Sequence, residues 1–239
     1  MAVTLDPLVD ETRRGQIVRQ LRGLIVSGAV PAGQRLTEQG LADQLGVSRA
    51  PLREAIGELV DCGLLVSQPY RGITVRNFTR RDLEELYSMR TALEKFAFRT
   101  CWDKRTPEAL NDLRNRNEAV QSHPLDGDSP LHGIELELEL HSWCYELSDH
   151  TLLQQAWRRI VPNLQFYFAL NERAHQPAGM PQNPHDTYVE LACGDDLNEM
   201  LAHLDTHLRQ GLARTLSYID TASDATSEEY AQDGKVAKL

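Results

Sequence analysis

The stretch Arg35–Arg76, RLTEQGLADQLGVSRAPLREAIGELVDCGLLVSQPYRGITVR, decides how this chain is organised. Thr37 can cap a helix whose apolar positions follow helical spacing, and Gly46 permits a sharp turn because it has no Cβ. Ser48 is the next capping residue, and Pro51 comes early in a second helix, where its missing N–H costs little. The pattern predicts two short helices joined by a tight turn.

Two short apolar runs follow the helices, Leu64–Val66 and Ile73–Val75. The residues between them, Pro69–Gly72, have the composition of a turn, with Arg71 at the tip. We therefore expect a two-stranded hairpin. Helix, tight turn, helix and hairpin in this order are the layout of a winged helix-turn-helix, which places its second helix in the major groove of DNA.

The string GVSRAPLREAIGELVDCGLL, followed by RGITV, resembles the DNA-binding domain of GntR-type bacterial repressors. The preceding run Ile17–Glu38 is similar to that family's first helix and connecting loop. One departure is Gln39, where many members have a basic residue. The resemblance implies contacts with DNA phosphates and bases from Arg35, Thr37, Ser48, Arg49, Pro51, Arg53, Arg71 and Gly72. The alternative is that Arg49 and Arg53, four residues apart, belong to an ordinary solvated helix face.

Charge and composition divide the chain into two domains. The formal net charge is -10, but residues 1–77 hold nine Arg against eight Asp or Glu, a net of +1. Residues 78–239 carry the remaining net charge of -11, and this part must face away from DNA. We expect a DNA-binding domain over 1–77, an all-helical effector-binding and dimerisation domain over 78–220, and a flexible polar tail over 221–239. The fold class is mainly α.

Other features of the sequence indicate a cytoplasmic protein. The four Cys show no paired spacing, which is typical of reduced thiols. No apolar run is long enough to span a membrane, and the first residues lack the pattern of a signal peptide. These features predict no membrane partner.

Helical spacing dominates the second domain. Thr79 caps a predicted helix that ends near Cys101, and Pro107 opens another. The run ELELEL could be read as a strand, but Glu and Leu are good helix formers and the apolar pattern continues beyond it. We expect helices over 79–101, 107–122, 131–147, 151–170 with a kink at Pro162, 184–193 and 197–219.

Four residues of this helical part could converge on one divalent cation. Glu137 and His141 are one helical turn apart, and His185 and His207 lie on later helices. Imidazoles and a carboxylate are the donor types that transition metals prefer in proteins. His203 is a rival ligand, and a chain with eight His also produces such spacings by chance.

The string LYSMRTALEKFAFRTCW, the Glu-x-x-x-His pair and the later His residues resemble the ligand-binding (FCD-type) domain of the FadR subfamily of GntR regulators. Its metal-binding members use an acidic residue and a His on one helix plus two later His, which implies Glu137, His141, His185 and His207 as ligands here. The subfamily usually has Asp at the first of these positions. Zn is the expected metal, with Mn or Ni as alternatives.

Such a site could bind a small organic acid at the open positions of the metal. Arg90 could add a charge-assisted contact, or it could instead pair with Glu94 four residues on. Tyr167 and Arg173 are further candidates for the effector site. We expect a homodimer that binds a short inverted repeat in double-stranded DNA and responds to this effector. The alternatives are a metal-free bundle that only dimerises, and a zinc hydrolase or lyase, for which no well-placed general base is evident.

Overall fold

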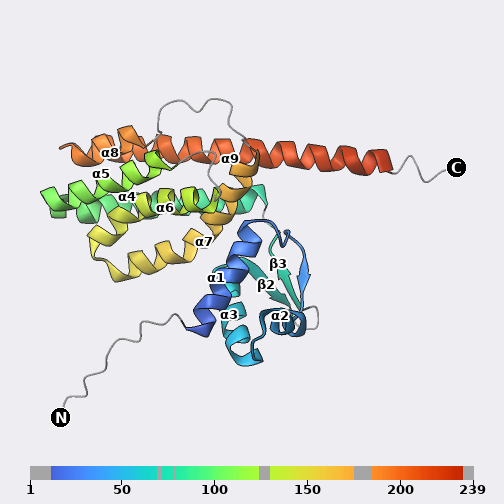
Figure 1. Cartoon of the computed structure of the whole chain (residues 1–239). Coiled ribbons are helices and arrows are strands. Elements are labelled where there is room, and N and C mark those ends of the chain that lie inside the picture. Colours follow the sequence, from blue (N-terminus) through green and yellow to red (C-terminus); the bar gives the residue numbers. More distant parts are fainter. Residues whose placement is uncertain (1–11, 69–71, 78, 124–129, 175–184, 234–239) are drawn as a thin grey trace, which may run out of the picture. The chain divides into compact units, whose positions relative to one another are not determined.

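A computed structural model describes residues 12–68, 72–77, 79–123, 130–174 and 185–233. The side chains of 130, 131, 170–174 and 217–233 are outside this description. Contacts between residues divide the chain into two compact units, Met1–Asn77 and Phe78–Leu239. Figure 1 shows their helices and strands, and each unit is described by itself.

The first unit is a small winged helix-turn-helix. Its helices are α1 (Arg13–Val26), α2 (Glu38–Leu45) and α3 (Arg49–Asp61). Its strands are β1 (Arg35–Leu36), β2 (Leu65–Gln68) and β3 (Gly72–Val75), in the antiparallel order β1-β3-β2. Helix α1 packs against α3, and the buried core is formed by aliphatic side chains of both helices and of the sheet. These include Ile17, Leu21, Ile25, Leu52, Leu59, Leu64, Leu65, Ile73 and Val75.

Local sequence explains the turn between α2 and α3. The Thr37 hydroxyl accepts a hydrogen bond from the Gly40 amide and caps α2. Gly46 ends α2 with a left-handed φ of 62°, a conformation that costs glycine little. Ser48 occupies the N-cap position of α3, but its side chain makes no capping hydrogen bond. The predicted helix pair is therefore present, whereas the predicted two-stranded hairpin is part of a three-stranded sheet.

Among its described residues, the second unit consists of helices joined by turns and short irregular connections. It contains α4 (Arg80–Cys101), a 3-10 turn (Trp102–Lys104), α5 (Pro107–Ser122), α6 (Pro130–Ser148), α7 (Thr151–Ala174), α8 (Asp186–Cys193) and α9 (Leu197–Asp233). Thr79 and Asp82 form a reciprocal capping box at the start of α4, and Thr106 caps α5. The mainly α fold class predicted from sequence is confirmed, and the ELELEL run lies within α6.

Helices α4, α6 and α9 build the centre of this unit. In Figure 1, α4, α5, α6 and α9 run alongside one another, while α7 bends along its length and contains Pro162. Gly211 allows α9 to approach α4 closely, since a Cβ there would lie 3.3 Å from the Tyr87 ring. Helix α9 continues to Asp233, so residues 221–233 are helical where a flexible tail was expected. Among the described residues, no helix combines the length and the apolar character needed to cross a bilayer.

The buried stripe of α3 generates a test of the winged core. Leu59 is fully buried, so Leu59→Ala leaves a cavity and is expected to lower the free energy of unfolding by about 2–5 kcal/mol. Leu24→Ala, at a position on α1 that is 38% exposed, is expected to cost clearly less. Urea denaturation followed by circular dichroism measures both. Equal losses for the two variants would contradict the placement of Leu59 in the core.

Candidate metal centre and nucleic-acid interface

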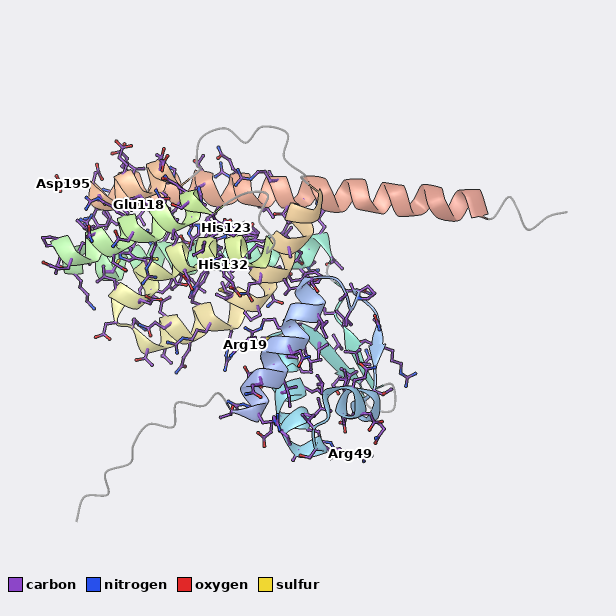
Figure 2. All side chains as sticks on the ribbon, viewed as in Figure 1. Arg19, Arg49, Glu118, His123, His132 and Asp195 are labelled. Carbon is purple, nitrogen blue, oxygen red and sulfur yellow. The ribbon has the colours of Figure 1, made fainter. Side chains whose placement is uncertain are left out.

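The exposed arginines of α3 contact acceptors on α2. The Arg53 Nε donates to Glu38 Oε2 at 2.8 Å, and an Arg49 guanidinium nitrogen donates to the side-chain oxygen of Gln39. The Gln39 amide in turn donates to Asp43 Oδ1 at 2.7 Å. Exposed pairs of this kind contribute little to stability, so the arginines can exchange these acceptors for phosphates or base edges. Figure 2 shows Arg49 at the surface of the winged unit.

The other predicted DNA contacts are arranged as follows. Arg35, on β1, lies beside the wing, because a Cβ at Gly72 would be 3.5 Å from Arg35 Nε. Gly72 has a left-handed φ of 84° at the start of β3. Ser48 is exposed, Pro51 lies in the first turn of α3, and Thr37 uses its hydroxyl to cap α2. Arg71 lies outside the described residues.

Three histidines meet inside the helical unit. His141 comes from α6, His185 from the residue preceding α8, and His207 from α9. One nitrogen of each lies within 4.8 Å of a nitrogen of the others, and all three residues are buried. Their ring centroids are 5.2–5.4 Å apart. Three histidines that are more than twenty positions apart in sequence thus place three nitrogen donors close enough to bind one metal ion.

The electrostatics of this three-histidine cluster favour neutral imidazoles. Burial lowers the pKa of His141 well below its ordinary value, and it also lowers the pKa of His185. Burial and the neighbouring histidines lower the pKa of His207 to about 2. The Nε2 atom of His141 has no hydrogen-bond partner among the described residues. A buried polar atom without a partner is costly, and a neutral imidazole nitrogen is the form that binds a metal.

The fourth predicted ligand lies at the rim of the cluster. Glu137 Oε1 is 3.7 Å from His185 Nε2, and the Glu137 side chain is 35% exposed. Glu137 does not belong to the group of atoms that lie within 4.8 Å of one another. The rival His203 stacks on His207, with ring centroids 5.6 Å apart, but it is also outside that group. His123 and His132, labelled in Figure 2, instead contact each other, at 5.2 Å between ring centroids.

Glu94 is the central residue that sequence reasoning considered only as a partner for Arg90. Glu94 is completely buried, and its Oε1 lies 2.7 Å from His141 Nδ1. Burial raises the pKa of Glu94, and the charge of Arg90 opposes this effect. A signal was present in the sequence: Arg90 and Glu94 fall on the same face of α4 as the buried Leu83, Tyr87 and Ala97. Two charged residues on a buried helix face require partners in the interior.

Arg90 lies next to this carboxylate. Its Nε donates to Glu94 Oε2 at 3.3 Å, so the alternative ion pair considered from sequence is present. Its Nη2, however, has no hydrogen-bond partner among the described residues. The guanidinium carbon lies 5.8–6.0 Å from the ring centroids of Tyr87, Trp157 and Phe168. A cation in an aromatic surrounding with one unused donor edge can bind an anionic oxygen.

Tyr167 and Arg173 are the remaining residues that the sequence suggested for the effector site. Tyr167 is buried on α7, and its hydroxyl donates to the Thr79 carbonyl at 3.5 Å. The side chain of Arg173 lies outside the described residues.

Comparison with known proteins accounts for both units. Residues 13–75 match the model of the family "Bacterial regulatory proteins, gntR family", and residues 85–229 match the FCD domain. The HTH-type transcriptional regulator McbR of Escherichia coli (strain K12) is 31% identical over 74% of this chain and 80% of that protein. A probable D-xylose utilization operon transcriptional repressor of Paenarthrobacter nicotinovorans is 29% identical over 85% of this chain and 90% of that protein.

A solved structure of E. coli McbR/YncC has the same fold, with a TM-score of 0.73 and 23% identity, covering 87% of this chain and 99% of that one. The family matches follow the two-unit division seen in the structure. The chain therefore belongs to the GntR family of bacterial regulatory proteins and is a DNA-binding transcriptional regulator with a C-terminal FCD domain.

Proposed function

We propose that this regulator senses a small carboxylate through a divalent metal held in its FCD domain, and that it does so as a homodimer on an inverted-repeat operator. The observation that carries the proposal is the meeting of His141, His185 and His207 in the buried interior, with His141 Nε2 unpartnered among the described residues. The resemblance to the metal-binding FadR subfamily supports the same site. The repressor named among the relatives supports a repressor role, exercised on DNA in the cytoplasm.

The donor set fits a transition metal. Three neutral imidazoles suit Zn²⁺ best, with Mn²⁺ and Ni²⁺ as alternatives, and Glu137 is proposed as the carboxylate ligand beside them. When bound, the ion supplies open coordination positions for carboxylate oxygens. Arg90 Nη2 is proposed to bind another oxygen of the effector, and Tyr167 and Arg173 to complete the site. These residues orient the effector and exclude water from it.

Metal analysis is the first test of this proposal. We expect about one metal per chain after supply of Zn²⁺, Mn²⁺ or Ni²⁺, and its loss in His185→Ala/His207→Ala, because two of three buried nitrogen donors are removed. The matched control is His123→Ala/His132→Ala, which removes two histidines outside the cluster and should keep the metal. A folded wild-type protein that takes up none of these ions would favour the metal-free dimerisation bundle.

The effector response is the second test. Screening hydroxy- and keto-carboxylates against a DNA duplex selected by the protein from a random pool should identify one that shifts the DNA affinity. A tenfold shift corresponds to about 1.4 kcal/mol of differential binding between the two states. His207→Ala should retain DNA binding but lose the shift, as measured by fluorescence anisotropy. A normal response in this variant would contradict a metal-anchored effector site.

The DNA interface has its own test. The selected duplex should contain an inverted repeat, and Arg49→Ala should cost about 1–3 kcal/mol of DNA binding if Arg49 contacts a base edge. Arg99→Ala removes an arginine of α4 in the FCD domain that is also exposed, and it serves as the control. Unchanged affinity for Arg49→Ala would assign Arg49 to an ordinary solvated face.

A further inference from the structure

The carboxylate of Glu94 lies at the meeting point of three helices. Its Oε1 is 2.7 Å from His141 Nδ1 on α6 and accepts a hydrogen bond from the Tyr188 hydroxyl of α8 at 3.2 Å. Its Oε2 accepts from Arg90 Nε, one turn earlier on α4. Glu94, His141 and Tyr188 are each completely buried, so solvent does not substitute for any of these bonds. One side chain therefore contacts both a histidine of the cluster and the arginine of the proposed effector site.

The bonding pattern determines which nitrogen of His141 carries the proton. Arg90 can only donate, and its positive charge next to Glu94 Oε2 favours the ionised carboxylate, whose oxygens can only accept. His141 Nδ1 must then be the N–H that donates to Glu94. In a neutral imidazole this leaves the lone pair on Nε2, the atom without a hydrogen-bond partner among the described residues. We propose that Glu94 is a positioning residue that holds His141 in the tautomer able to bind metal through Nε2.

Charge supports the same role. Arg90 acts electrostatically on all three histidines of the cluster, so its positive charge would also oppose a divalent cation there. Glu94 lies between Arg90 and His141 and offsets this repulsion. Because Glu94 engages Arg90 through Nε, it also leaves the Nη2 edge for an anion. If the Arg90–Glu94 pair served only to stabilise the fold, Glu94 would not need its hydrogen bond with His141.

The inference rests on the proposed metal site, but its test separates the two. The variant is Glu94→Gln, which keeps the shape of the side chain and removes its charge. In the wild type without metal, ¹⁵N-resolved imidazole NMR should show His141 protonated at Nδ1. In Glu94→Gln this preference should weaken, because the amide oxygen is a poorer acceptor than a carboxylate and the amide nitrogen can instead donate to Nδ1. Zn²⁺ affinity, measured by competition with a chelator, should fall about 10- to 100-fold. The control is Leu83→Val, a buried substitution three turns away on α4, which should weaken folding but leave tautomer and affinity unchanged.

Each result decides the question. A smaller fraction of the Nδ1–H form and a lower Zn²⁺ affinity in folded Glu94→Gln support the positioning role, whereas wild-type values of both overturn it. If wild-type protein binds no Zn²⁺, the metal proposal fails, and the tautomer of His141 in the two proteins still tests Glu94. If Glu94→Gln does not fold, the neutral pair Arg90→Gln/Glu94→Gln removes the unpaired buried charge, and retention of the Nδ1–H form there overturns the inference.

Discussion

Burial of charged and polar side chains at the centre of the FCD domain is the constraint on which the arrangement of its helices depends. A buried ion pair is stable only when its hydrogen-bonding capacity is satisfied by well-placed partners. Glu94 meets this condition with three partners from α4, α6 and α8. Arg90 and Glu94 pair within α4, so moving α6 or α8 would not break the ion pair but would remove a buried hydrogen bond to Glu94. These bonds therefore help to fix the positions of α6 and α8 against α4.

The same group leaves two polar atoms unused, and they are the ones on which a function can be built. His141 Nε2 and Arg90 Nη2 are buried without hydrogen-bond partners among the described residues. Each would be an unfavourable feature in a domain whose only role was to hold two copies together. Their proximity to one shared carboxylate gives a physical reason to connect the proposed metal site with the proposed anion site.

Much of this architecture could be predicted from sequence because its signals are local. The cap at Thr79, the proline at the start of the helix at Pro107 and the left-handed turn at Gly46 mark helix boundaries as predicted. Strand β1 was missed, since two residues cannot show an alternating pattern and its pairing with β3 is a tertiary effect. The helix α9 was predicted too short because its polar end resembles a loop, although a helix already formed extends at little cost.

The same difference between local and long-range signals applies to the candidate site. Sequence spacing and family resemblance singled out His141, His185 and His207, whose convergence the structure then describes. Glu137 was predicted as a ligand equal to the histidines. Its Oε1 lies 3.7 Å from His185 Nε2, at the rim of the three-histidine cluster. The role of Glu94 depends on contacts 47 and 94 residues away in sequence, which no local pattern can reveal.

Helix α9 is one continuous helix that runs from the buried His207 of the FCD domain to Asp233. His207 lies near its start, while the helix continues to Asp233, beyond the neighbouring helices in Figure 1. At 1.5 Å per residue, the distance from His207 to Asp233 is about 39 Å. A change of one degree in the axis at His207 therefore moves the far end by ~0.7 Å. If the helix stays straight, an angular change of about five degrees around the histidines would displace its far end by about 3.4 Å, roughly one atomic contact distance.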